Sequence, residues 1–259
     1  MPTALTIAGS DSGGGAGIQA DLKTFAALGV YGTSAITAVT AQNTLGVRGW
    51  EPVSVALVIS QIDAVLDDIG ADAVKIGMLA TAPIVEAVDT ALARLALPHV
   101  VIDPVMIAKG GDRLLKEDAI VALRSLLRHA HVVTPNIPEA EVLASLPIRN
   151  LDDMREAGAR ILSLGPRVVL VKGGHAGGPE SIDVACTPQG DFEIRGPRLQ
   201  GRHTHGTGCT LSSAIAAYLA RGSTDEEALR QARTYLEGAI RNAPQIGSGH
   251  GPLNHFWRT

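Results

Sequence analysis

The chain is poor in aromatic residues and in clustered charge, and each shortage argues against a class of partner. Phe, Trp and Tyr make up only 3% of the 259 residues, too few for the aromatic platforms on which single-stranded nucleic acids stack. The net charge is −4 and no block of basic residues is present, so the electrostatic footprint of a nucleic-acid-binding protein is also missing. We therefore expect no nucleic-acid partner.

Cysteines and long apolar runs are also scarce. The two cysteines, Cys186 and Cys209, form no Cys-x-x-Cys pair and make no disulfide framework, which favours a reducing compartment. The first residues lack the basic start and apolar run of a signal peptide. The uncharged stretch from Thr24 to Val47 is interrupted by polar residues and glycine, which argues against a membrane span. We expect a cytoplasmic protein without a membrane partner.

Short runs rich in Val and Ile alternate with longer amphipathic segments along the chain. This alternation predicts an α/β fold with helices on both faces of a mostly parallel sheet. The predicted strands are Ala4–Ala8, Ser34–Thr40, Ala73–Gly77, Val100–Asp103, Val132–Thr134 and Val168–Lys172. The predicted helices are Gly17–Leu28, Val53–Ile69, Thr81–Ala96, Glu117–His129, Pro138–Leu146, Leu151–Leu164, Gly208–Ala220 and Asp225–Asn242.

One segment breaks the alternation and predicts an antiparallel edge. Ile182–Thr187 and Phe192–Leu199 flank Pro188-Gln189-Gly190-Asp191, which has the composition of a turn, so the pair is typical of a hairpin. With 46% apolar residues, the chain is long enough to bury one large core. Because no linker, internal repeat or low-complexity tract divides it, we expect a single domain over residues 1–259.

Polar and glycine-rich residues follow most of the predicted strands. In open α/β sheets, ligands bind at the carboxyl ends of the strands. These residues therefore predict one site built from many loops, unless each group is simply the turn that every strand needs. The groups are Gly9-Ser10-Asp11, Gln42-Asn43, Gly77-Met78, Asp103-Pro104, Pro135-Asn136 and Gly173-Gly174.

The run from Gly201 to Gly222 combines a glycine-rich turn with a helix start, and this combination binds anions. Gly206, Thr207 and Gly208 carry little bulk, so the backbone can approach a ligand closely. The unpaired N–H groups and the dipole of a helix N-terminus favour phosphate. Cys209 sits at that positive end, where we expect the pKa of its thiol to be lowered. The alternative is a glycine turn before a buried helix with a small packed cysteine.

Four further positions each allow a functional and a structural interpretation. Asn136 and Glu139 suit Mg²⁺ held through water, and they suit equally an N-cap with an acid in the first helical turn. Lys172 ends a predicted strand, where it can bind phosphate or simply be solvated. Asp103 precedes Pro104 and can hold a metal or a proton, or make a turn.

The loop after the first strand argues against two other nucleotide-binding classes. Gly15–Ala20 matches the dinucleotide fingerprint G-x-G-x-x-A, but no Asp or Glu between Asp21 and Glu51 supplies the acid that holds the ribose. No Walker A lysine pattern occurs, which argues against a P-loop NTPase. His203 and His205 lie beside the glycine turn, and without further ligands they are a weak zinc signal.

Eight segments, spread in order along nearly the whole chain, match one known family. They are Ala8–Lys23 (AGSDSGGGAGIQADLK), Thr40–Thr44 (TAQNT), Lys75–Leu79 (KIGML), Asp103–Met106 (DPVM), Thr134–Glu139 (TPNIPE), Lys172–His175 (KGGH), the glycine turn itself, and Gly249–Phe256 (GHGPLNHF). The chain thereby resembles the hydroxymethylpyrimidine/phosphomethylpyrimidine kinases of thiamine biosynthesis, within the ribokinase-like superfamily. The resemblance implies that superfamily's three-layer α/β/α sandwich and, by analogy, a homodimer.

The resemblance also implies a reaction and its acceptor site. The γ-phosphate of ATP would pass, with Mg²⁺, first to the hydroxymethyl oxygen of 4-amino-5-hydroxymethyl-2-methylpyrimidine and then to the monophosphate. Gln42 would pair with the pyrimidine edge, because an amide offers a donor beside an acceptor. Gly9, Asp21, Met78 and Val105 would line the same pocket.

The phosphate end follows from the same resemblance. Gly206, Thr207, Gly208 and Cys209 would form an anion hole, because their N–H groups face the transferring phosphoryl group. Lys172 would support the phosphates. The residues that would position Mg²⁺ are Asn136 and Glu139, through water, and less directly Asp103.

Cys209 stands where sugar kinases of the superfamily usually carry an aspartate, the base for the acceptor hydroxyl. We expect Cys209 to be the base in the first transfer only, because a phosphate acceptor is already largely ionised near pH 7. The alternative is that positioning and Mg²⁺ suffice and Cys209 supplies only its N–H. Three rival functions stay open: a pyridoxal kinase of the same fold, a non-catalytic pyrimidine-binding module, and an NAD-dependent oxidoreductase.

Overall fold

The computed structural model describes residues 1–95, 97–106, 117–175, 180–199 and 201–258, and within them nine strands form one sheet. The strand order is β3-β2-β1-β4-β5-β6-β7-β8-β9, and its central strands β2, β1, β4, β5, β6 and β7 run parallel, as predicted. The strands are β1 (Thr3–Ser10), β2 (Tyr31–Asn43), β3 (Gly46–Pro52), β4 (Ala73–Ile76), β5 (Val100–Ile102), β6 (Val132–Val133), β7 (Val168–Val171), β8 (Glu180–Thr187) and β9 (Gly190–Pro197).

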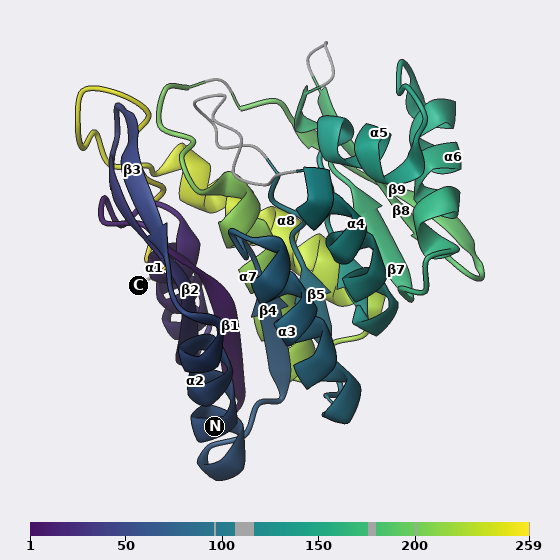
Figure 1. Ribbon diagram of the computed structural model, residues 1–259. Coiled ribbons are helices and arrows are strands. Elements are labelled where there is room, and N and C mark those ends of the chain that lie inside the picture. The colour runs from purple at the N-terminus through teal and green to yellow at the C-terminus, as the bar shows by residue number, and fades with distance from the viewer. Residues whose placement is uncertain (96, 107–116, 176–179, 200, 259) are drawn as a thin grey trace.

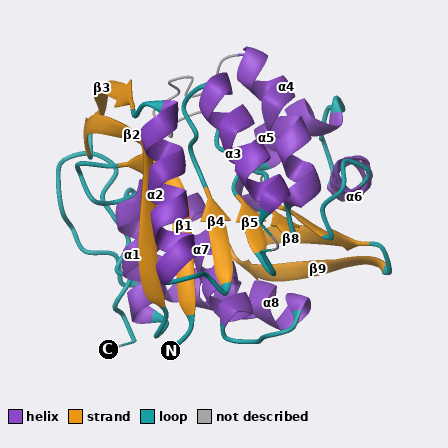
Figure 2. Cartoon of the chain, turned by 60° about the horizontal axis from the view of Figure 1, so that its bottom comes forward, coloured by secondary structure: helices purple, strands orange, loops and turns teal. Residues whose placement is uncertain are grey.

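Helices cover both faces of this sheet and complete a three-layer α/β/α sandwich (Figures 1 and 2). On one face lie α1 (Gly17–Ala27), α7 (Thr207–Ala220) and α8 (Asp225–Arg241). On the other lie α2 (Val55–Asp68), α3 (Ala82–Arg94), α4 (Glu117–Leu126), α5 (Ile137–Ala144) and α6 (Leu151–Leu162). The predicted fold class is therefore confirmed.

The central strands are largely apolar because both of their faces are covered, and Lys75 in β4 is a buried exception. In β5, Val100 and Ile102 belong to the core beneath α2 to α6, whereas Val101 between them belongs to the core beneath α1, α7 and α8. Successive side chains of a strand point to opposite faces, so a strand between two helix layers favours apolar residues at nearly every position.

Among the helices that the structure describes, none combines the length and the apolar character that a membrane span requires.

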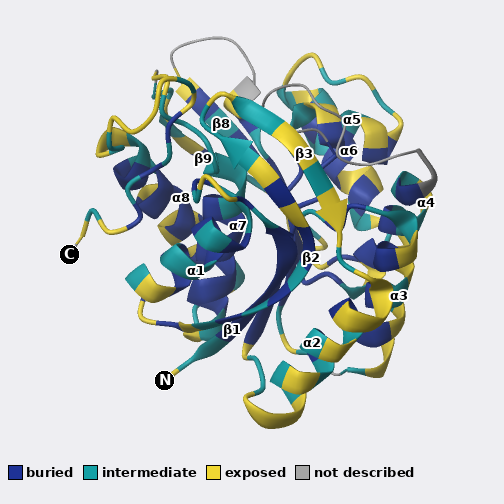
Figure 3. Cartoon of the chain, turned by 60° about the vertical axis from the view of Figure 1, so that its left-hand side comes forward, coloured by how far each residue is buried: buried dark blue, intermediate teal, exposed yellow. Residues whose placement is uncertain are grey.

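The sheet has an antiparallel edge on each side, and only one was predicted. β8 and β9 form the predicted hairpin, joined by a tight turn at Pro188 and Gln189. β3 pairs antiparallel with β2 on the opposite edge, and the sequence analysis missed it. Most of β3 is exposed, as Figure 3 shows, and it contains Gly46 and Gly49, so it has no apolar alternation to reveal it.

Side-chain caps set several helix starts. Ser54 is the N-cap of α2, and its hydroxyl accepts from Leu57 N, so this helix begins at Val55, two residues after the predicted Val53. Asn150 caps α6 in the same way. Polar side chains thus fix the residues at which these two helices begin.

Candidate active site

A cavity of about 1560 Å³ lies at the carboxyl ends of the central strands. This is the location expected for a ligand in an open α/β sheet. Twelve of the thirteen predicted site residues line it: Gly9, Gln42, Met78, Asp103, Val105, Asn136, Glu139, Lys172, Gly206, Thr207, Gly208 and Cys209. The fold therefore brings these residues together from loops that are far apart in the sequence.

Asp21 is the exception, and its predicted position in the pocket lining is corrected. Its side chain is fully buried in α1, beneath the cavity. The carboxylate accepts from the hydroxyls of Thr6 and Ser213, each at 2.6 Å, and pairs with Lys75 Nζ at 2.8 Å. Lys75 itself lines the cavity. Asp21 thus contributes to the site by holding this lysine, which the sequence analysis did not assign.

The lowered thiol pKa expected for Cys209 is wrong. Burial raises the pKa of Cys209 to about 11, and the nearby carboxylates of Asp21 and Asp103 add to the rise. The Lys75 ammonium and the Gly17 N–H oppose it without overcoming it. The position at the start of α7 is as predicted, but desolvation outweighs the helix terminus. In this structure the group is a neutral thiol at neutral pH.

Two carboxyl groups and an ammonium group form a cluster opposite the glycine turn. Lys172 Nζ lies 2.8 Å from Asp103 Oδ1, and both side chains are largely buried. Burial by itself would lower the pKa of Lys172, but Asp103 and Glu139 hold it above its usual value. Burial raises the pKa of Glu139 to about 7, with Lys172 opposing and Asp103 adding to the rise. On this side of the cavity, the Lys172 ammonium group therefore lies close to the carboxyl groups of Asp103 and Glu139.

Asn136 and Glu139 make the capping box of α5, so the structural interpretation holds for this pair. Asn136 Oδ1 accepts from Glu139 N at 3.0 Å, and Glu139 Oε2 accepts from Asn136 N at 2.8 Å. The second carboxylate oxygen of Glu139 has no role in the box, and the residue also lines the cavity. Capping and ligand binding are therefore compatible at Glu139.

Mg²⁺ fits these residues in the way that hydrated Mg²⁺ is usually held. In the described part of the chain, no group of three or more His, Cys, Asp or Glu side chains can hold a metal ion. Mg²⁺ does not need such a cage, because it keeps several waters and takes one or two carboxylates together with substrate phosphates. Glu139 and Asp103 both line the cavity and are the carboxylates that act on Lys172.

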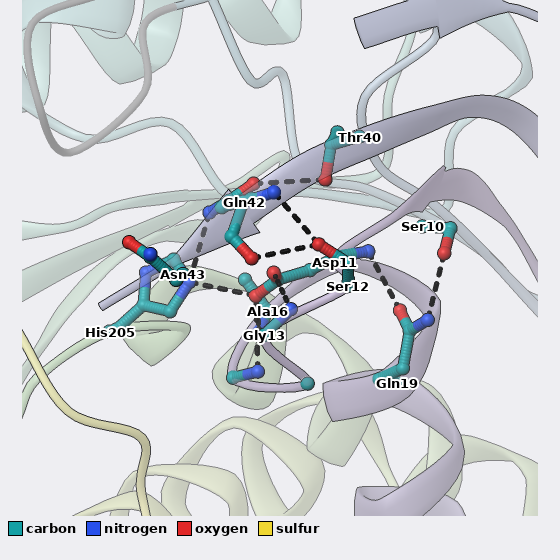
Figure 4. A network of polar contacts seen from close by, with 12 residues as sticks. Ser10, Asp11, Ser12, Gly13, Ala16, Gln19, Thr40, Gln42, Asn43 and His205 are labelled. Carbon is teal, nitrogen blue, oxygen red and sulfur yellow. Dashed lines mark hydrogen bonds and ion pairs between the residues drawn. The ribbon is translucent and has the colours of Figure 1, made fainter. Parts of the chain in front are cut away.

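A second polar network, shown in Figure 4, joins the loop after β1 to the glycine turn. Asp11 Oδ2 lies 2.8 Å from His205 Nε2, and the same ring nitrogen lies 3.1 Å from the amide nitrogen of Gln42. From the sequence, His205 was only a weak zinc signal, and Asp11 was one of the polar residues that follow the first strand, with no individual role. The one available signal was that both residues directly flank glycine-rich loops.

The glycine turn itself requires glycine because the two loops touch. Gly206 has φ +82°, and a Cβ there would lie 1.9 Å from the carbonyl oxygen of Gly15. A Cβ on Gly15 would in turn lie 2.6 Å from His205 Cδ2. The first turn of α7 follows directly, so its N–H groups at Thr207 to Cys209 open into the cavity without partners inside the helix.

These features define a class of enzyme. A parallel sheet carries a cavity at its carboxyl ends, a helix N-terminus faces that cavity through a glycine turn, and a lysine with two acids stands opposite. This is the arrangement of a phosphotransferase with a ribokinase-like fold.

Comparison with known proteins identifies the family. The model of the family described as phosphomethylpyrimidine kinase matches residues 11–254. The chain is 48% identical, over 98% of its length and 94% of the other protein's, to the hydroxymethylpyrimidine/phosphomethylpyrimidine kinase of Bacillus subtilis. The chain belongs to the phosphomethylpyrimidine kinase family and is a kinase.

Solved structures of kinases with two different acceptors have the same fold as this chain. The phosphomethylpyrimidine kinase of Clostridium difficile has a TM-score of 0.84 at 46% identity, over 93% of this chain and 100% of that one. The pyridoxal kinase of Staphylococcus aureus, solved with AMP-PCP and pyridoxal, has a TM-score of 0.90 at 34% identity, over 99% and 94%. Overall shape therefore does not separate the two activities, whereas sequence identity and the family match favour the pyrimidine kinases.

Proposed function

We propose that the cavity transfers the γ-phosphoryl group of ATP to the hydroxymethyl oxygen of 4-amino-5-hydroxymethyl-2-methylpyrimidine, and then to the phosphate of that product. The name of the Bacillus subtilis relative covers both steps. The observation that carries the proposal is that one cavity is lined both by Gln42 and by the glycine turn from Gly206 to Cys209. An aminopyrimidine and a phosphoryl group thus find matching partners within the same space.

The acceptor end lies between β2 and β5. Gln42 offers an amide to the amino group and ring nitrogen of the pyrimidine, while Met78 and Val105 supply apolar surface. Gly9 leaves room at the end of β1, where an added Cβ would already touch the sulfur of Met78 at 3.4 Å. An apolar surface with one amide suits a small flat ring that carries polar groups on one edge.

At the phosphate end, charge is neutralised from two sides. The N–H groups of Thr207, Gly208 and Cys209 face the transferring phosphoryl group at the positive end of α7. Gly208 lies beside the opposite wall, since a Cβ there would be 3.5 Å from Lys172 Nζ. Lys172 is therefore placed to support the same phosphates.

Mg²⁺ would be held by Glu139 and Asp103 through water, with Asn136 orienting Glu139 through the capping box. When bound, the ion supplies positive charge to the phosphate oxygens. Until then Lys172 is the partner of Asp103, and burial keeps Glu139 partly protonated near neutral pH.

Cys209 is the candidate base for the first transfer. Its thiol is neutral in this structure, so it must lose its proton to act as a base. Lys75 and the Gly17 N–H are the groups that favour the thiolate. The second transfer needs no base, because the acceptor phosphate is already ionised.

The test is phosphoryl transfer from ATP and Mg²⁺ to three acceptors: hydroxymethylpyrimidine, its monophosphate and pyridoxal. Turnover of both pyrimidines, each with a much higher kcat/KM than pyridoxal, supports the proposal. Faster turnover of pyridoxal would contradict the proposal and show that the chain is a pyridoxal kinase. Binding of the pyrimidine without turnover of any acceptor would show that the chain is a non-catalytic pyrimidine-binding module.

A homodimer and a cytoplasmic location stay predictions. Light scattering on the purified chain at several concentrations checks the first. Fractionation of the producing cell checks the second.

A further inference from the structure

His205 links two parts of the cavity through a single ring nitrogen, and its backbone leads into a third. Its Nε2 contacts the carboxylate of Asp11 and the amide of Gln42, and the next residue opens the glycine turn (Figure 4). The ring packs directly on Gly15, where a Cβ would lie 2.6 Å from His205 Cδ2. The imidazole is therefore fixed in place between the acceptor end and the phosphate end.

This ring nitrogen carries a hydrogen. The carboxylate of Asp11 accepts from the backbone N–H groups of Gly13, Gly15 and Ala16 at 2.8 to 3.0 Å. Burial by itself would raise the pKa of Asp11, but His205 and these N–H groups outweigh it and leave the pKa below its ordinary value. Since a carboxylate can only accept, its 2.8 Å contact requires His205 Nε2 to donate.

The hydrogen on His205 decides which end of the Gln42 amide faces it. An amide nitrogen has no lone pair to offer, so an NH₂ group 3.1 Å from a ring N–H would place two donors face to face. The two ends of an amide are nearly equal in size, and a half-turn brings the oxygen to His205 instead. The same half-turn brings the NH₂ group to the hydroxyl of Thr40, now 3.4 Å from the other end, which can accept.

We propose that His205 is a positioning residue that sets acceptor specificity by fixing the orientation of the Gln42 amide. The amide then offers the cavity an acceptor on the His205 side and a donor on the Thr40 side. A 4-aminopyrimidine has an amino donor beside a ring-nitrogen acceptor and matches this pattern in one orientation. A 4-oxopyrimidine carries the reverse pattern and does not match it in that orientation. This inference rests on the proposed function, because it takes Gln42 as the residue that pairs with the pyrimidine.

The experiment measures the calorimetric Kd of hydroxymethylpyrimidine and of its 4-oxo counterpart, without nucleotide. Wild type should prefer the amino compound by at least about tenfold, the cost of one mismatched buried hydrogen bond. His205→Ala frees the amide to turn, so the preference should fall towards about one. His205→Gln can place an N–H donor near the position of Nε2 and should retain most of the preference.

A double-variant comparison separates this role from a merely structural one. In a Gln42→Ala background, His205→Ala should change the preference by less than about twofold, because the histidine acts through Gln42. Thermal melts identify variants that do not fold. If His205→Ala is one of them, His205→Asn, whose shorter side chain does not reach Asp11, takes its place.

The outcomes are distinct. A wild type that binds neither pyrimidine overturns the proposed function and this inference with it. A wild type that prefers the amino compound, together with a folded His205→Ala variant that keeps the full preference, overturns the inference alone. An equal change in the Gln42→Ala background also overturns it, because the histidine would then act independently of that amide.

Discussion

Replacing Lys75 with methionine should destabilise the chain strongly although it removes a single contact. Lys75 and Asp21 are 2.8 Å apart and both side chains are fully buried. Lys75→Met keeps most of the volume but leaves the Asp21 carboxylate with only the hydroxyls of Thr6 and Ser213. Breaking a buried pair in this way costs about 3–5 kcal/mol of unfolding free energy, because an uncompensated charge stays inside.

An exposed ion pair of the same length provides the matched control. Arg94 and Asp63 also lie 2.8 Å apart, but their side chains are 52% and 38% exposed. Water screens such a pair, so Arg94→Met should cost less than about 1 kcal/mol. The contrast isolates burial, since distance and charge type are the same in both pairs.

Urea unfolding with a check for an unchanged m-value measures both variants. The loss in Lys75→Met corresponds to a melting temperature lower by about 6–20 °C. Asp21→Asn in the same chain should recover much of it, because the amide carries no charge, its oxygen accepts from one of the two hydroxyls and its NH₂ group donates to the other. Pairing holds the pKa of Lys75 above its usual value, so its contribution is present below the unfolded pKa near 10 and should be equal at pH 6 and pH 8. A loss as small as that of Arg94→Met, or no recovery in the double variant, would refute the reasoning.

Four further predictions concern other buried or capping residues. If Cys209 is the base, its thiol pKa of about 11 makes the first-transfer rate rise from pH 7 to 9; Cys209→Ala should lose this rise in a pH–rate profile, and the buried-thiol control Cys186→Ala should keep it. Glu139→Gln keeps the capping box and should unfold at higher urea than wild type at pH 8 without Mg²⁺, and this difference should shrink as the pH falls from about 7 towards 4.5, because only the ionised acid is costly to bury. Burial and the neighbouring His131 lower the pKa of His99, so urea stability should fall as pH drops below about 6.5, and His99→Phe should reduce that fall. Asn150→Ala removes the N-cap of α6 and should cost about 1 kcal/mol in the same assay.

Most of the fold could be predicted because its central strands sit between two helix layers. Apolar residues at every position, as in Val168–Val171, are visible in the sequence without any neighbour. The hairpin edge was visible through its turn at Pro188 and Gln189. The opposite edge, Gly46–Pro52, was not, because it is held by backbone pairing to β2 and buries few side chains.

The features of the site also divide into those that a local sequence pattern reveals and those that depend on tertiary packing. Glycine turns and strand-end polar residues are local signals, and together with the family resemblance they identified twelve residues that line the cavity. The thiol pKa of Cys209 was wrong because burial and the nearby carboxylates come from tertiary packing, not from the helix start. The Asp11–His205 contact joins residues 194 positions apart, so no local pattern could reveal it.

The two ends of the cavity come from different parts of the chain, and this separation has a consequence for specificity. The proposed acceptor residues lie between Gly9 and Val105, whereas the glycine turn and Lys172 lie beyond Asn136. The pyridoxal kinase of Staphylococcus aureus shares this fold at a TM-score of 0.90, so the same fold is compatible with a different acceptor. Substitutions of the proposed acceptor residues Gln42, Met78 and Val105 should then change which acceptor binds while leaving nucleotide affinity nearly unchanged. The contact between Asp11 and His205 is one place where the two parts meet, and it is there that a change at the acceptor end can reach the phosphate end.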